Sequence, residues 1–397
     1  MKTLFAHDHR FFQQGSTMLS KNAFDAAVWD RYLEHTDELV VVARVFDLPT
    51  DADISKYGIS SAPHVSFKHL PASHHWTNML PYNQAQQKMN QEVSQVDAVI
   101  ARLPSRIGTM AVKAAKKLGK PYAIEVVGDP VESYLHHGSK TLKLLAKRTG
   151  NRMKENISSC SHVLYVTQRD LQEKYPTTGM QRSASNVEID TISEHIASAR
   201  EARIHTQQNK IVKIGIIATL NTNYKGIDTA IEAMQLLQNS HPQTHLYILG
   251  PGNPDKWLQL AVNHHVAEAV TFCGILPAGE AVLNWLDTMD IYIQPSRTEG
   301  VPRALIEAMA RGCAAVGSTA GGIPELLSPE YIHEIGNAHA LADTLSDLMQ
   351  HPEKQIQQSK QNIAMAASYT KPVLQKRRAE LFASFFDTVK NKERTLS

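Results

Sequence analysis

This sequence of 397 residues has few cysteines, no long apolar run and no excess of either charge. Its three cysteines, Cys160, Cys273 and Cys313, lie far apart and form no Cys-x-x-Cys pair. A disulfide framework and a zinc ribbon are therefore not expected, and reduced thiols in a cytoplasm fit best. No run approaches the length of ~18 apolar residues that a membrane-spanning helix needs, and the polar start is not that of a secretory signal.

The charge balance excludes another class of protein. Lysine and arginine number 41 against 39 aspartates and glutamates, which leaves a net charge of +2. Proteins that wrap nucleic acid need a clear basic excess, so no nucleic-acid partner is expected. A chain of this length exceeds one ordinary core, and two domains of similar size are predicted.

Short apolar runs alternate with longer helical patterns in both halves of the chain. The strand-like runs are 2–6, 38–45, 96–101, 122–127 and 161–166, and then 211–217, 244–250, 270–274, 291–294 and 313–317. Such alternation is typical of α/β proteins, in which helices cover both faces of parallel sheets. The sequence therefore predicts two doubly wound, Rossmann-like domains facing a central cleft.

A polar stretch at about 175–210 interrupts this rhythm and predicts the domain boundary. We expect an N-terminal domain over 1–190 and a C-terminal domain over 191–371. The tail from about 354 reads as helix, and its last part, about 372–397, is expected to join the first domain. Ligands of such sheets bind beyond the carboxyl ends of the strands, where the strand order reverses.

The most informative stretch is 296–317, which reads SRTEGVPRALIEAMARGCAAVG. Pro302 suits the start of a helix and Gly312 suits its end. The free amides of the first turn favour an anion such as phosphate. Glu307, one turn into the helix, can accept hydrogen bonds from a ribose diol, and Glu299 can reach a second sugar. The pattern predicts a sugar-nucleotide site, whereas a solvated Glu299 and a helix-stabilising Glu307 are the alternative.

This stretch resembles the E-x7-E region of the retaining glycosyltransferases of family 4, which have the GT-B fold. Further segments match that family in the same order: YKGIDTAIEAM with Lys225 and Gly226, LYILGPG at 246–252, and VTFCG at 270–274. The resemblance covers the second domain loosely and the first domain only at SHVLYVTQRDLQEKYP (161–176). It implies a nucleotide-sugar donor in the C-terminal domain and an acceptor in the N-terminal domain.

The resemblance also implies roles for individual residues. Glu299, Lys225 and Asp129 are the catalytic candidates, and the Lys225 ammonium would stabilise the departing diphosphate. A solvated turn lysine is the alternative for Lys225. The candidates for binding the donor are Glu307, Gly300, Val301, Pro302, Arg303, Ala304, Leu305, Gly15, Thr219 and Gly250.

The sequence departs from the family pattern at two positions. Thr219 stands where many members carry an arginine facing the diphosphate, and Arg303 is the expected substitute. Gly128 replaces a histidine that often contacts the donor sugar. The neighbouring Asp129 stays a candidate for a sugar or acceptor contact, with helix capping as the alternative. Gly15 resembles a glycine loop that lets the chain approach the diphosphate, although one glycine is a weak signal.

Neither a metal nor a cofactor is expected. His7, Asp8 and His9 look like metal ligands but lack a third ligand nearby, so an acceptor contact or a structural role is favoured. Asp51-Ala52-Asp53 mimics the Asp-x-Asp motif of another glycosyltransferase fold without its strand context. The GT-B resemblance implies no divalent ion for the leaving group.

The segment 140–154 holds six basic residues interleaved with leucines and a methionine. A cationic helix of this kind can lie on an anionic leaflet and present a lipid-linked acceptor. The alternative is a solvated helix with a core stripe. Peripheral contact with the inner face of the cell membrane is therefore one expectation and a purely cytoplasmic protein is the other.

Together these features predict a retaining, metal-independent enzyme of the hexosyltransferase type. It would move a sugar from a nucleoside-diphosphate sugar to the hydroxyl of a carbohydrate or lipid-linked saccharide, in the synthesis of capsule, O-antigen or exopolysaccharide. One alternative is a catalytically silent nucleotide-sugar-binding scaffold. The other is an NAD-linked oxidoreductase, for which the third glycine after Gly250-Pro251-Gly252 is missing.

Overall fold

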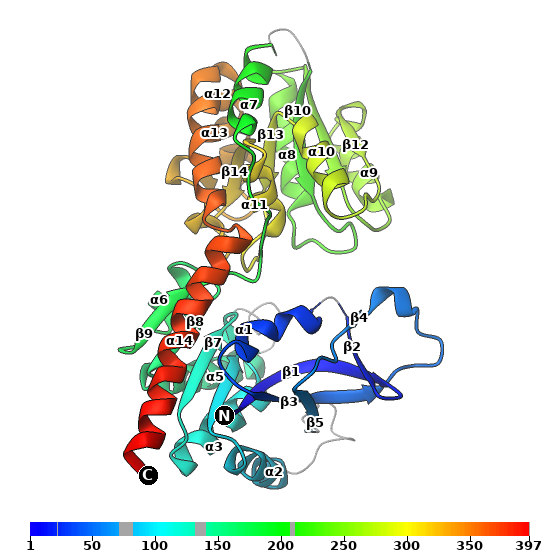
Figure 1. Cartoon of the computed structure of the whole chain (residues 1–397). Helices are drawn as coiled ribbons and strands as arrows, with labels where there is room; N and C mark the ends of the chain where they lie inside the picture. Colours follow the sequence, from blue (N-terminus) through cyan, green and yellow to red (C-terminus); the bar gives the residue numbers. More distant parts are fainter. Residues whose placement is uncertain (22, 71–81, 132–139, 207–210, 397) are drawn as a thin grey trace. The chain divides into compact units, whose positions relative to one another are not determined.

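The computed structural model describes residues 1–21, 23–70, 82–131, 140–206 and 211–396, of which 140–146, 393, 395 and 396 are described as backbone alone. The chain divides into two compact units, with Met1–Ala184 and Gln375–Ser397 in unit 1 and Ser185–Leu374 in unit 2. The predicted boundaries lie a few residues from these. Each unit is an α/β structure, as the sequence pattern predicts (Figure 1).

The sheet of unit 1 is parallel through its centre. Its parallel strands, in spatial order, are β5 (Val65–His69), β3 (Glu38–Asp47), β1 (Lys2–Gln14), β6 (Ala98–Leu103), β7 (Tyr122–Val126), β8 (His162–Tyr165) and β9 (Met180–Ser183). Short antiparallel strands extend one side, β2 (Thr17–Ser20) against β1 and β4 (Gly58–Ile59) against β2. The strand order reverses between β1 and β6, because β3 and β5 follow β1 on one side and β6 lies on the other.

Helices cover the sheet of unit 1 and have clear sequence causes. α3 (Arg106–Leu118) begins where the Ser105 hydroxyl accepts the Gly108 N–H at 2.7 Å and ends at Gly119, whose φ of 63° suits glycine. Its apolar side packs with α2 (Tyr82–Ser94) against the strands. The other helices of unit 1 are α1 (Asp30–Leu33), α5 (Lys140–Ser158), α6 (Asp170–Lys174) and most of α14 (Lys371–Leu396).

Unit 2 repeats the plan with a sheet that is parallel throughout. Its strands, in spatial order, are β12 (Val270–Phe272), β11 (Thr244–Leu249), β10 (Val212–Ile217), β13 (Ile291–Gln294), β14 (Ala314–Ser318) and β15 (Ile332–His333). The order reverses between β10 and β13. The helices are α7 (His195–His205), α8 (Ile227–Gln238), α9 (Asp255–Asn263), α10 (Glu280–Thr288), α11 (Arg303–Ala310), α12 (Ala338–Gln350) and α13 (Pro352–Ala367).

Some local predictions differ from the structure. The first strand does not end at residue 6 but continues to Gln14, where Gly15 and Ser16 form the turn of a β1–β2 hairpin. Polar residues continue β1 through pairing with β2 and β3, so Gly15 lies in a hairpin turn, and its predicted contact with the diphosphate stays a prediction. The polar stretch at about 175–210 contains β9 and α7.

Part of the predicted membrane-contact segment, the side chains of 140–146, lies outside the described residues. The backbone of 140–154 belongs to α5. In the described ranges, no helix has the length and apolar character needed to cross a bilayer.

Candidate functional site

In unit 2 the loops that follow β10 and β13 meet where the strand order reverses. Lys225 lies in the loop after β10, and Glu299 lies in the loop after β13. In open α/β sheets this reversal point is the usual place for a ligand. The topology alone therefore brings together two residues that are 74 positions apart in the sequence.

Gly226 allows these two loops to lie side by side. Its φ is 68°, and a Cβ atom there would lie 2.0 Å from the Pro295 carbonyl oxygen. The Arg297 N–H donates to the Tyr224 carbonyl at 2.7 Å across the same contact. A side chain at position 226 would push the loops apart, so this glycine sets the distance between Lys225 and Glu299.

Glu299 forms the centre of a compact polar cluster. Its Oε1 accepts from Lys225 Nζ at 2.5 Å, from Ser296 Oγ at 2.8 Å and from Gln294 Nε2 at 2.9 Å. The Glu299 side chain is 9% exposed, and that of Lys225 is 29% exposed. Among the described residues these contacts all fall on Oε1, which leaves Oε2 available to a hydroxyl group of a ligand.

The cluster continues inward through residues that the sequence analysis did not single out. Gln294 Nε2 also donates to Ser296 Oγ at 2.8 Å, and the Tyr292 hydroxyl donates to Gln294 Oε1 at 2.9 Å. All three side chains are fully buried. Burial raises the pKa of Tyr292, so its hydroxyl stays protonated and holds the glutamine amide in one orientation. Gln294, a polar residue at the end of the apolar run 291–294, was the sequence feature that could have pointed to these residues.

Helix α11 begins at Arg303, shortly after Glu299 in the sequence. The first backbone bond closes from the Ile306 N–H to the Pro302 carbonyl at 3.2 Å, and no described side chain caps the helix. The N–H groups of Arg303, Ala304 and Leu305 precede that bond and favour an anion. Pro302 is the N-cap with ψ of 107°, one residue before the helix rather than within it.

Glu307 lies in the second turn of α11 and is largely buried. Desolvation raises the pKa of its carboxyl group, and the charge of Arg303 opposes that rise. Arg303 Nη1 lies 3.8 Å from Glu307 Oε1 and donates to the Glu188 carbonyl at 3.1 Å. The structure thus places Arg303 beside Glu307, and its predicted contact with a diphosphate stays a prediction.

The remaining donor-binding candidates of unit 2 lie in neighbouring loops. The Gly300 carbonyl accepts from the Gly322 N–H at 2.9 Å, and Val301 follows in the same turn. Thr219 Oγ1 lies 3.4 Å from the Pro251 carbonyl. Gly250 has a φ of 149°, and a Cβ there would lie 2.0 Å from the Ala218 carbonyl oxygen. This glycine therefore permits close packing of the loops after β10 and β11.

Asp129 lies in unit 1, after β7. Its Oδ1 accepts from the Tyr175 hydroxyl at 2.6 Å and from the Val131 N–H at 2.8 Å, and Lys174 Nζ lies 3.5 Å from Oδ2. The bond to Val131 is the geometry of a helix cap, which the sequence analysis gave as the alternative. Its catalytic role stays a prediction.

The histidines at the start of the chain are buried beside arginines. Desolvation and Arg102 lower the pKa of His7 to about 3 and that of His9 to about 4, so both are neutral near pH 7. The Asp8 carboxylate accepts from the Arg106 and Ile107 N–H groups at 2.7 Å and 2.9 Å. Among the residues that the structure describes, no three acidic, histidine or cysteine side chains are grouped as metal ligands.

Comparison with known proteins agrees with the α/β architecture. Residues 211–351 match the family model for glycosyl transferases group 1. The solved structure of HepE from Anabaena in complex with UDP superposes with a TM-score of 0.63 at 17% identity, covering 97% of this chain and all of that one. The chain has the GT-B fold. The matched region contains Lys225, Glu299 and Glu307.

Two curated relatives extend the comparison. Protein CapJ of Staphylococcus aureus is 29% identical over 370 residues, which are 92% of this chain and 91% of that protein. The amylovoran biosynthesis glycosyltransferase AmsK of Erwinia amylovora is 35% identical over 139 residues, or 32% of this chain and 34% of that one. The similarity to CapJ extends over both units of this GT-B chain.

Proposed function

We propose that this GT-B chain is a retaining glycosyltransferase that moves a sugar from a nucleoside-diphosphate sugar to an acceptor hydroxyl in the synthesis of a bacterial surface polysaccharide. The observation that carries the proposal is the Lys225–Glu299 pair, which lies at the reversal point of the unit 2 sheet within the group 1 domain. Relatives named for amylovoran and colanic acid biosynthesis support the pathway, and HepE structures with UDP and UDP-glucose support the class of donor.

In this mechanism the donor is held by fixed groups of unit 2. The α11 amides and Lys225 bind the diphosphate, Glu307 accepts from the ribose hydroxyls, and Glu299 accepts from the transferred sugar. The bond from the sugar C1 to the diphosphate oxygen breaks, and a bond from C1 to the acceptor oxygen forms on the same face. The acceptor proton passes to the departing phosphate oxygen. Lys225 stabilises the charge that develops there without a metal ion.

A binding panel tests the proposal. Isothermal titration of the full chain with UDP, GDP, ADP, their sugars and NAD, without added divalent ion, is expected to give saturable binding of at least one nucleotide sugar. A transfer assay with that donor is then expected to retain the α configuration in the product, read by NMR. Binding of a nucleotide sugar with no transfer to any acceptor and no hydrolysis of the donor would favour the scaffold alternative. Binding of NAD alone would overturn the proposal.

The buried position of Glu307 predicts a pH dependence of donor binding. Because burial raises the pKa of its carboxyl group, Glu307 takes up a proton at a higher pH than an exposed glutamate. The carboxylate binds ribose hydroxyls better than the neutral acid, so donor affinity is expected to fall at least about fivefold between about pH 8 and about pH 5. The raised pKa also means that the stability Glu307 contributes is present at low pH and is lost as pH rises.

Glu307→Gln isolates this effect, because the amide does not titrate. Its affinity for the nucleotide sugar is expected to be lower than wild type at about pH 8 and nearly flat with pH. The nucleotide sugar is the proper ligand here, since its phosphates are diesters and do not titrate in this range. Parallel pH profiles for the wild type and Glu307→Gln would exclude Glu307 from donor binding.

A further inference from the structure

Unit 1 contains a cavity of about 660 Å³ at the carboxyl ends of β6 and β7, beside the point where the pairing of β1 with β6 ends. Its wall includes Asp8 of β1, the residues from Leu103 at the end of β6 to Arg106 at the start of α3, and Pro130 after β7. β1 and β6 are the neighbours between which the strand order reverses. The cavity therefore occupies in unit 1 the position that favours a ligand in an open α/β sheet.

The charge around this cavity is positive. Arg148 and Arg152 lie one turn apart on α5, and Arg106 lies in the first turn of α3. Within the described part of the chain, neither Arg148 nor Arg152 takes part in an ion pair or hydrogen bond. Asp8 is the acidic side chain of the lining, and its carboxylate is already engaged by the Arg106 and Ile107 N–H groups. The guanidinium groups of Arg148 and Arg152, next to one engaged carboxylate, suit an anionic ligand.

The remaining wall of the cavity is largely apolar. Leu103, Pro104, Met110, Pro130 and Met153 contribute to it, and the Tyr82 ring lies 5.9 Å from the Arg106 guanidinium carbon. An apolar wall next to several arginines matches a ligand that carries both a charged phosphate and a nonpolar group. A free inorganic anion would use only the charged side of such a cavity.

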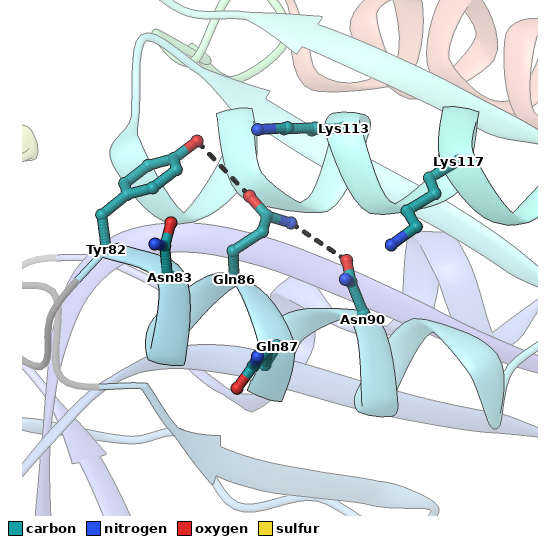
Figure 2. A pocket seen from close by; sticks show the side chains of 7 residues that line it. All are labelled: Tyr82, Asn83, Gln86, Gln87, Asn90, Lys113 and Lys117. Atoms are coloured by element: carbon teal, nitrogen blue, oxygen red, sulfur yellow. Dashed lines mark hydrogen bonds between the residues drawn. The ribbon is translucent and has the colours of Figure 1, made fainter.

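An adjoining groove provides a contrast. Figure 2 shows this groove, which Asn83, Gln86 and Asn90 of α2 and Lys113 and Lys117 of α3 line with Tyr82 and Gln87. Gln86 is already engaged, since its amide donates to Asn90 Oδ1 at 3.1 Å and to the Met110 carbonyl at 3.0 Å. The lining of the groove contains no arginine. Of the two sites, only the larger cavity is lined by guanidinium groups.

We infer that the larger cavity binds the phosphate or diphosphate group of an acceptor that carries a nonpolar chain next to that group. This inference rests on the proposed function, because only a glycosyltransferase would use the ligand as an acceptor. It adds the chemical class of that acceptor. Arg148 and Arg152 hold the phosphate, and Arg106 adds positive charge to the same lining. The apolar wall takes the first carbons of the chain.

Soluble probes below their micelle concentration test this inference on the full chain. Octyl phosphate is expected to bind at least about tenfold more tightly than the neutral octyl glucoside, because two to three charge-assisted contacts are added. It is also expected to bind more tightly than inorganic pyrophosphate, because only octyl phosphate uses the apolar wall. Equal affinities in either comparison would overturn the inference.

A pair of double variants on one helix supplies the matched control. Arg148→Ala with Arg152→Ala is expected to weaken octyl phosphate binding at least about tenfold. Lys147→Ala with Lys154→Ala removes the same charge from α5 at positions that do not line the cavity, and its affinity is expected to stay within about twofold of wild type. If both double variants lose the same affinity for octyl phosphate, the effect comes from nonspecific surface charge and the inference is overturned. The same conclusion follows if both variants lose only their binding to phosphatidylglycerol vesicles, and lose it equally.

The outcome is separable from that of the proposed function. The arginine double variant is expected to bind the nucleotide sugar like wild type, while Glu307→Gln is expected to bind octyl phosphate like wild type. If the wild type binds octyl phosphate but no nucleotide sugar, the proposed function is refuted and the anion site is retained. Loss of octyl phosphate selectivity would refute the anion site and leave the proposed donor site standing.

Discussion

Lys225→Ala is expected to lower the turnover of sugar transfer by about 100- to 1000-fold, the range seen when one donor that stabilises a developing oxyanion is removed. The Lys225 ammonium lies 2.5 Å from Glu299 Oε1, the carboxylate that is proposed to bind the transferred sugar. Without it, the charge on the departing phosphate loses its proposed ammonium partner, and the α11 amides remain. Glu299 retains its bonds from Gln294 and Ser296, so the fold is expected to survive.

The control for this variant is Lys256→Ala. Lys256 Nζ donates to Asn223 Oδ1 at 2.6 Å in the same loop region, and its removal takes away one charge near the site without touching Glu299. Steady-state kinetics with the identified donor and a melting curve for each variant separate catalysis from stability. A Lys225→Ala enzyme that turns over within about threefold of the Lys256→Ala enzyme would remove Lys225 from the mechanism.

The α/β fold was predictable because its parallel strands are buried on both faces. Runs such as 291–294 and 244–250 are almost wholly apolar, and β13 and β11 occupy nearly the same residues. The extension of β1 to Gln14 was not predictable by the same argument. Its second half is polar and is held by pairing with β2 and β3, which is a contact between distant segments rather than a local pattern.

The resemblance assigned Lys225 and Glu299 to one donor site, and the structure places them in contact. The orientation of Glu299 could not be predicted, since it depends on Gln294, Ser296 and Tyr292, which meet only in the folded chain. Asp129 likewise accepts a hydrogen bond from the hydroxyl of Tyr175, which is 46 residues away. Side-chain networks of this kind have no short-range sequence pattern.

Gly321→Ala is expected to reduce sugar transfer at least about 100-fold, although residue 321 has no chemical group to contribute. A Cβ atom there would lie 1.8 Å from the Glu299 carbonyl oxygen, and the φ of Gly321 is 51°. The overlap is with backbone, so the loop that carries Glu299 must move by more than about 1 Å, a displacement that can cost about 100-fold in rate. The neighbouring bond from the Gly322 N–H to the Gly300 carbonyl shows how closely the two loops pack.

Gly274→Ala separates this displacement from backbone strain. Gly274 has a φ of 71° in the same unit, and nothing lies within 4 Å of a Cβ built there. Both variants carry the left-handed backbone cost of about 1–2 kcal/mol, so both are expected to melt a few degrees lower than wild type. Only Gly321→Ala is expected to lose transfer and donor affinity, because only there does the added methyl group displace Glu299. If both variants melt lower but transfer sugar equally well, the position of the Glu299 loop does not control catalysis.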